Sequence, residues 1–200
     1  MDRQQFWDER HAAHEPIESP KPDESLVAVT AGWTPGRALD LAAGDGRNAV
    51  WLATQGWQAT AVDFSAVALA RAGRTAAAAG VEIGLVQADL LTWQPEPRSW
   101  DLVALVYLHL PAPERRAVYS AAASAVAPGG HLVIVGHDLS NLTDGVGGPQ
   151  DPAVLFTASD IADELRVDDP TLSVERAQLV RRDAGDGRQM IDALIVATRP

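Results

Sequence analysis

The sequence contains no cysteine, and Lys21 is the only lysine among its 200 residues. The absence of cysteine excludes disulfide scaffolds, thiolate nucleophiles and thiolate zinc sites. The shortage of basic residues leaves a formal net charge of -11. Nucleic acids and anionic lipid surfaces bind through a surplus of Lys and Arg, so we expect neither as a partner.

Long apolar runs are also missing. No run approaches the roughly 18 consecutive apolar residues that a membrane span needs, and the first residues, MDRQQFWDERHAAHE, carry charges where a secretory signal has an apolar core. We expect a soluble, cytoplasmic protein. With 46% hydrophobic residues, the chain predicts a single domain over 1–200, including an N-terminal helical cap and linker over 1–30.

Short β-branched runs alternate with alanine-rich stretches, a pattern typical of a parallel sheet with helices on both faces. The predicted strands and helices follow this alternation through the first two thirds of the chain. The strands are 37–41, 58–62, 81–87, 101–107 and 131–135, and the helices are 47–55, 65–80 and 113–127. Ser65 is the expected N-cap of the second of these helices.

The last third of the chain breaks this alternation. A polar, glycine-rich stretch predicts a lid loop over 138–156, and Thr157 with Asp160 resembles a capping box that opens a helix over 159–165. The extended runs 172–181 and 189–198 are separated by RDAGDGR, which is too short for a crossover helix, so we expect an antiparallel pair. The predicted fold is α/β: a Rossmann-like, seven-stranded, mostly parallel sheet with an antiparallel last strand.

The stretch DLAAGDGRN follows the first predicted strand. Gly44, Gly46 and Ala49 fit G-x-G-x-x-G/A, in which glycines let the backbone approach a nucleotide at a helix N-terminus. Asp40 and Asp63 stand at the carboxyl ends of successive predicted strands, where open α/β sheets bind ligands. Asp63 lies about 20 residues beyond Gly44, the spacing at which a carboxylate accepts ribose hydroxyls. The sequence therefore predicts a ribose-containing ligand.

Acidic residues favour one ligand of this kind. Asp40 and Asp45 would repel the phosphates of a dinucleotide, whereas S-adenosylmethionine has no phosphate and carries a sulfonium and an ammonium. Asp89, at the end of the third predicted strand, is placed to accept a hydrogen bond from the adenine amine. Phe64 and Leu90 are the expected apolar walls around the base.

Four segments carry a resemblance to a known family: ALDLAAGDGRNAVWLATQGWQATAVDFS, VQADLL, WDLVALVYLHLP and APGGHLVIVGHD. In order and spacing the chain resembles the class I S-adenosylmethionine-dependent methyltransferases, and within them the small tellurite-resistance and thiopurine-methyltransferase-like branch. Ala42 stands where that family commonly has the first glycine of its loop, so we expect Ala42 to keep a negative φ.

The resemblance implies S-adenosylmethionine as cofactor, S-adenosylhomocysteine as its product, and an N-terminal helix that folds over the cofactor. Trp7 would lie on that helix, and Arg10 would meet the methionine carboxylate or an acidic substrate. The predicted cofactor-binding residues are Asp40, Ala42, Gly44, Gly46, Asn48, Asp63, Phe64, Asp89, Leu90 and Tyr107, together with Trp7 and Arg10.

His109 and His137 are the candidate catalytic residues, since imidazole titrates near neutral pH and deprotonates hydroxyl or amine nucleophiles. His109 serves equally well as a base or as a wall of the adenosine pocket. His137 could pair with Asp138, but neighbours on an extended chain point to opposite faces, which favours substrate contact for His137. We expect no metal.

Three functions follow from these residues. The first is methyl transfer to a small-molecule acceptor through oxygen, nitrogen or sulfur. The second is a catalytically inactive sensor or partner protein that binds S-adenosylmethionine or S-adenosylhomocysteine. The third, an NAD-dependent oxidoreductase, is opposed by the terminal hairpin and by the lack of a Tyr-x-x-x-Lys motif.

Overall fold

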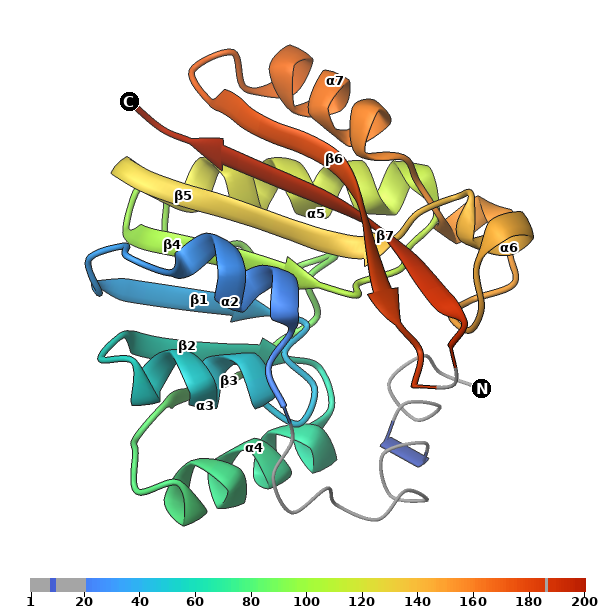
Figure 1. Ribbon diagram of the computed structural model, residues 1–200. Coiled ribbons are helices and arrows are strands. Elements are labelled where there is room, and N and C mark those ends of the chain that lie inside the picture. Colours follow the sequence, from blue (N-terminus) through green and yellow to red (C-terminus); the bar gives the residue numbers. More distant parts are fainter. Residues whose placement is uncertain (1–7, 10–20, 186) are drawn as a thin grey trace. The chain divides into compact units, whose positions relative to one another are not determined.

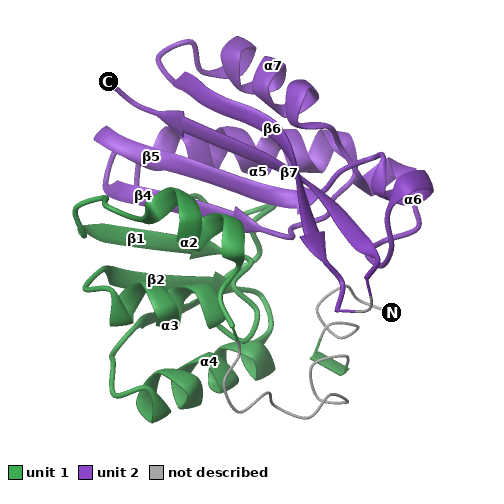
Figure 2. Cartoon of the chain, viewed as in Figure 1, with its two compact units in different colours: residues 1–94 green, residues 95–200 purple. Residues whose placement is uncertain are grey.

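The computed structural model describes residues 8–9, 21–185 and 187–200 (Figure 1). Trp7, Arg10 and most of the expected N-terminal cap therefore lie outside the described residues. The chain divides into two compact units, residues 1–94 and 95–200, and each is described by itself (Figure 2). A single domain over 1–200 stays a prediction.

Seven strands form the sheet in the order β3-β2-β1-β4-β5-β7-β6. β1/β2, β2/β3 and β4/β5 are parallel pairs, while β7 runs antiparallel to both β5 and β6. The predicted Rossmann-like fold, mostly parallel with an antiparallel last strand and with helices around the sheet, is confirmed. The strands are β1 (Arg37–Leu41), β2 (Gln58–Asp63), β3 (Gly84–Gln87), β4 (Trp100–Val106), β5 (Val126–His137), β6 (Ser173–Asp183) and β7 (Gln189–Thr198).

From residue 21 on, unit 1 contains β1 to β3 with the helices α2 (Glu24–Thr30), α3 (Arg47–Thr54) and α4 (Ala66–Ala78). α3 packs on β1 and β2, and α4 packs on β2 and β3. β1 and β2 are buried along almost their whole length, as in a parallel sheet covered on both faces, and they supply the core with side chains such as the fully buried Leu39 and Val62. Ser65 is the N-cap of α4 as predicted, because its side chain accepts a hydrogen bond from the Ala68 N–H.

Unit 2 contains β4 to β7 with α5 (Ala112–Ala125), α6 (Asn141–Asp144), the 3₁₀ helix η1 (Pro152–Val154) and α7 (Ala158–Asp168). α5 packs on β4 and β5, and α7 packs on β6 and β7. Thr157 and Asp160 form the predicted capping box at the start of α7. Among the described helices, none has both the length and the apolar character required to cross a membrane.

Three segments differ from the predicted elements for local reasons. The third strand begins at Gly84 and not at 81, because the Val81 N–H is used to close α4 through the Ala76 carbonyl. The fifth strand is longer than 131–135, since the backbone of Gly129 and Gly130 pairs with Arg199. The predicted loop over 138–156 contains α6 and η1.

Gly46 brings the loop after β1 against α4. It has φ +75°, and a Cβ there would lie 2.5 Å from the Ala72 Cβ. Close backbone approach of this kind is the reason for glycine at the start of such a helix.

Gly46→Ala should therefore lower the free energy of unfolding by about 2 kcal/mol or more, through steric overlap added to backbone strain. Gly80→Ala is the matched control: Gly80 has φ +70°, with nothing within 4 Å of its Cβ position. Urea unfolding should show a distinctly smaller loss for Gly80→Ala, and equal losses in the two variants would contradict the packing role.

Candidate functional site

The loop after β1 turns the chain into α3 through three residues with left-handed backbone. Ala42 has φ 56°, Gly44 φ 54° and Gly46 φ 75°. The expectation that Ala42 keeps a negative φ was wrong. The turn needs the left-handed conformation at this position whichever residue occupies it, so the alanine holds a strained backbone that a glycine would adopt freely.

Asp63, the last residue of β2, holds this loop in place. Its Oδ2 accepts a hydrogen bond from the Gly44 N–H at 2.9 Å, and its Oδ1 accepts one from the Ser65 N–H at 2.9 Å. One buried carboxylate thus joins the loop after β1 to the loop after β2. Each oxygen keeps acceptor capacity for a ligand hydroxyl.

Among the described acids of unit 1, Asp40 is the most deeply buried, with 1% of its surface exposed. Its Oδ2 accepts a hydrogen bond from the Ala49 N–H at 3.1 Å. Burial raises the pKa of Asp40 to about 7, against the lowering effects of the Ala49 hydrogen bond and the Arg47 charge. A cation bound beside Asp40 would favour its ionised form, which is the electrostatic property expected of a site for a positively charged ligand.

Other predicted cofactor residues have partners in the protein itself. The Asn48 Oδ1 accepts a hydrogen bond from the Asp23 N–H at 2.9 Å, which ties α3 to the start of α2. Asp89 is exposed and its Oδ1 accepts from the Leu91 N–H, as in an Asx turn. Phe64 and Leu90 are half-buried, so their side chains remain available to a base.

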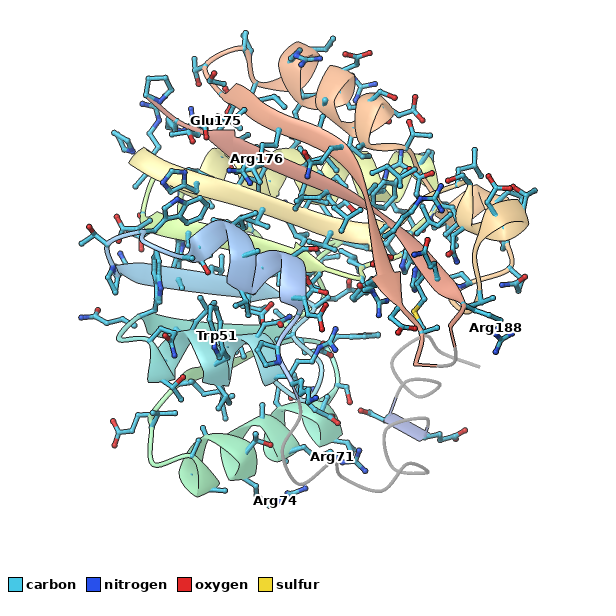
Figure 3. The ribbon with its side chains drawn as sticks, viewed as in Figure 1. Trp51, Arg71, Arg74, Glu175, Arg176 and Arg188 are labelled. Carbon is cyan, nitrogen blue, oxygen red and sulfur yellow. The ribbon has the colours of Figure 1, made fainter. Side chains whose placement is uncertain are left out.

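Two further pairs border the loops of unit 1. The Ser65 hydroxyl donates to Asp8, so the described part of the N-terminal segment reaches the loop after β2. Arg71, which is buried on α4 (Figure 3), lies 3.6 Å from Asp45 of the glycine loop.

In unit 2, Tyr107 follows β4 with φ 62°, an uncommon conformation for a bulky residue. Its hydroxyl donates to the Asp192 Oδ2 at 2.9 Å, and Arg182 donates to the same oxygen through Nε at 2.6 Å. The Arg182 guanidinium also lies over the Tyr107 ring, 5.3 Å from its centroid. Strained backbone of this sort concentrates at functional sites, and here it accompanies a buried network of side chains.

His137, the last residue of β5, pairs with this network. Its Nδ1 lies 2.9 Å from the Asp192 Oδ1. The dyad with Asp138 that the sequence left open is not formed, because the Asp138 Oδ1 accepts hydrogen bonds from the Ser140 N–H and hydroxyl. His137 and Asp192 are instead paired across the antiparallel β5/β7 register.

Burial acts to raise the pKa of Asp192, but hydrogen bonds from His137, Arg182 and Tyr107, together with the Arg182 charge, lower that pKa below its usual value. Asp192 therefore stays ionised at neutral pH, although none of its surface is exposed.

His109 stacks on His137, with ring centroids 5.3 Å apart and planes 7° apart. Its Nδ1 lies 3.3 Å from the Val154 carbonyl oxygen, so that nitrogen carries the hydrogen. Burial lowers the pKa of His109 to about 4. A neutral imidazole with so low a pKa is a weak base at neutral pH, which favours the wall of a pocket over the catalytic base for this residue.

Asn141 fixes the loop that the sequence predicted as a lid. Its Oδ1 accepts from the Ile191 N–H at 2.8 Å, and its Nδ2 donates to the Gly147 carbonyl at 2.9 Å. The loop is thus attached to β7, and its Gly148 backbone covers the His137 imidazole.

Sequence reasoning missed Asp192 and Arg182. Asp192 is the only charged residue in the run MIDALIVAT, and a lone acid within an apolar strand is a signal of a buried, paired carboxylate. Its partner could not be named, because the register between β5 and β7 brings the two residues together across a long separation in sequence.

Ala42→Gly should raise the free energy of unfolding by up to about 1 kcal/mol, because relief of left-handed strain exceeds the entropy that glycine adds to the unfolded chain. Ala79→Gly is the control, since Ala79 is exposed with φ -81° and should lose stability on the same change. Denaturant unfolding distinguishes the signs, and a loss in Ala42→Gly would contradict the strain.

Asp40→Asn should gain stability relative to the native protein as pH rises. The folded pKa of Asp40 is raised, so native stability from this group is present below its unfolded pKa of about 4 and is lost as pH approaches 7. Between pH 5 and pH 8 the difference in free energy of unfolding should move in favour of Asp40→Asn, by an amount on the order of 2 kcal/mol. Urea unfolding at both pH values measures it, and an unchanged difference would contradict the raised pKa.

Residues 38–130 match the family model described as a methyltransferase domain. No curated protein matches the chain in sequence.

Solved structures cover nearly the whole chain. One, from work on the conversion of a disulfide bond into a thioacetal group during echinomycin biosynthesis, is 21% identical with TM-score 0.75 and covers 99% of this chain and 92% of that chain. The DhpI–SAH complex is 25% identical with TM-score 0.64, covering 96% and 94%. TehB from Haemophilus influenzae is 17% identical with TM-score 0.69, covering 98% and 67%. Residues 38–130 are therefore similar to a methyltransferase domain, and the chain has the fold of these solved structures.

Proposed function

We propose that the protein is an enzyme that transfers a methyl group from S-adenosylmethionine to a small-molecule acceptor and leaves S-adenosylhomocysteine. The observation that carries this proposal is the buried carboxylate of Asp40 beside a left-handed, glycine-rich loop that Asp63 holds in place. The methyltransferase domain match and the likeness to a complex with SAH support it.

The residues of unit 1 fit this cofactor better than a dinucleotide. Asp40 and Asp63 are both buried acids at the ends of neighbouring strands, and Asp45 adds a third carboxylate to the loop. Such a set disfavours pyrophosphate and favours the ammonium and sulfonium groups. When bound, the cofactor supplies an electrophilic methyl group.

Residues of the chain itself bind and orient the cofactor. Asp63 fixes the loop and offers acceptor capacity to ribose hydroxyls, while ionised Asp40 balances positive charge. Phe64 and Leu90 provide apolar surface for the base, and Asp89 provides an acceptor for its amine. The predicted roles of Trp7 and Arg10 in covering the cofactor belong to the same proposal.

Unit 2 would serve the acceptor, with Tyr107, His109 and His137 around it. Most of the rate acceleration would come from holding the nucleophile in line with the methyl group and keeping water out, with the loop over 138–156 as the cover.

The net charge of -11 favours a small molecule over nucleic acid. We place the enzyme in the cytoplasm and, more finely, in the tellurite-resistance and thiopurine-methyltransferase-like branch.

Calorimetric titration with S-adenosylmethionine, S-adenosylhomocysteine and NAD tests the proposal. The native protein should bind the first two at micromolar concentrations and NAD far more weakly. Asp40→Asn keeps an oxygen that can accept from the Ala49 N–H, yet it removes the charge, so its affinity for S-adenosylmethionine should fall tenfold or more. Glu82→Gln removes the same charge from an exposed side chain of unit 1 and should bind like the native protein.

Preference for NAD, or no binding of S-adenosylmethionine and S-adenosylhomocysteine by the native protein, would contradict the proposal. Tight binding with no transfer to thiol, hydroxyl or amine acceptors is the result that the alternative predicts, a catalytically inactive sensor or partner protein.

A further inference from the structure

β6 lies at one end of the strand order, where β7 is its neighbour in the sheet. It is 11 residues long, which is long for an edge strand. Proteins commonly protect such edges with proline, lysine, a bulge or a short strand, because unpaired backbone groups attract another strand. The bulge of β6 lies near its start, between Val174 and Arg176, and residues 177–181, AQLVR, include no proline or lysine. We call residues 177–181 the edge stretch.

The hydrogen bonds of β7 determine which backbone groups of the edge stretch point away from the sheet. The Gln189 and Ile191 carbonyls both accept from residues on the β5 side of β7. Successive residues of a strand direct their N–H and C=O groups to opposite sides, so the even-numbered residues of β7 face β6 and pair with Gln178 and Val180. In the described parts of the chain, no residue bonds to the outward backbone groups of the edge stretch, which are those of Ala177, Leu179 and Arg181.

Side chains of the edge stretch are exposed on both faces of the sheet. Ala177, Gln178 and Leu179 are all exposed, and 44% of the Leu179 surface is accessible. Neighbouring side chains on a strand point to opposite faces, so neither face is covered along these residues. Another strand can therefore add to this edge without displacing a side chain of the protein.

We propose that β6 pairs antiparallel with β6 of a second copy of this chain, around a two-fold axis at Gln178, so that two sheets join edge to edge. A two-fold interface of this kind uses the same surface on both copies and closes as a dimer. In this register Ala177 of each copy lies opposite Leu179 of the other, which covers the exposed leucine. The inference concerns assembly and does not rest on the proposed function.

Three charged residues of β6 share one face of the sheet. Arg182 donates to Asp192, and the Glu175 Oε1 accepts from the Thr198 hydroxyl at 2.6 Å. Asp192 and Thr198 lie an even number of residues apart on β7, which places them on the same face. Arg176 lies an even number of residues before Arg182, beyond the bulge, and belongs to this face too. Around a two-fold axis perpendicular to the sheet, this face continues into the same face of the second copy.

Charge complementarity on this face favours the register centred on Gln178. It brings Glu175 of each copy toward Arg182 of the other and gives Arg176 an uncharged residue as its opposite neighbour. A register centred on Leu179 would instead set Arg176 directly opposite Arg182, once in each half of the interface. Like charges directly opposite one another destabilise an antiparallel pair, whereas opposite charges stabilise it.

Single cysteines test the register, because the native chain has none. Opposite residues in a non-hydrogen-bonded antiparallel pair have Cα atoms about 4.5 Å apart, a separation that a disulfide spans. Gln178→Cys should therefore form a disulfide-linked dimer on mild oxidation. Val180→Cys is the matched control on the same face, and it should stay unlinked because Arg176 of the second copy lies opposite. Equal linkage of both variants, or linkage of Val180→Cys alone, would overturn the register.

Sedimentation from low to high micromolar concentrations tests the dimer itself. The native protein should reach the mass of two chains, and Leu179→Lys should raise the dissociation constant at least about tenfold through lost apolar contact and repulsion near the axis. Val167→Lys adds the same charge at a side chain of α7 that is 72% exposed, and it should dimerise like the native protein. A native protein that stays monomeric, or equal effects of the two lysines, would overturn the inference.

Amide hydrogen exchange distinguishes a second copy from a segment of the same chain. The Leu179 and Arg181 N–H groups should exchange slowly in the dimer and rapidly after dilution to the monomer. The Gln178 and Val180 N–H groups face β7 and should exchange slowly at both concentrations, which makes them internal controls. Slow exchange of Leu179 in a monomer would assign the edge to another part of the chain, and rapid exchange in a dimer would place the interface elsewhere. Either result would overturn the inference.

Discussion

The Asp63 carboxylate holds two loops together, with one oxygen on the Gly44 N–H and the other on the Ser65 N–H. Together with the hydrogen bond from the Ala43 N–H to the Val62 carbonyl, this carboxylate fixes the glycine loop at the end of β2, and its bond to Ser65 orders the residue that caps α4. The same bonds place Asp40 beside a rigid backbone, where burial raises its pKa to about 7. The fold that fixes the loop therefore also buries Asp40, and the charged form of Asp40 is most stable when a cation is present.

Asp192 is also a buried carboxylate, but its pKa is lowered, whereas that of Asp40 is raised. Its three neighbours, Tyr107, Arg182 and His137, supply enough hydrogen bonds to lower its pKa in spite of complete burial. Arg182 balances the charge of Asp192 within the protein, whereas the buried carboxylate of Asp40 is suited to a cationic ligand.

Local signals in the sequence predicted the fold well. The Ser65 cap, the Thr157 capping box and the short spacer before β7 each depend on a few neighbouring residues, and the structure confirms them. Features that depend on distant partners were not accessible in this way. The φ of Ala42 follows from a turn that must meet β2, and the pairing of His137 with Asp192 follows from strand register. Residues of the candidate sites could be named from the sequence, whereas the side chains that pair with them in the fold could not.

Proton release on cofactor binding tests the central claim most directly. Calorimetry at pH 7 in buffers of different ionisation enthalpy, at concentrations that saturate both proteins, gives the number of protons exchanged when S-adenosylmethionine binds to the native protein and to Asp40→Asn. With its pKa near 7 in the free protein, Asp40 should lose about half a proton on average as the positively charged cofactor binds, and the variant should lack that release. Identical proton exchange in both proteins, or greater uptake by the native one, would contradict the account.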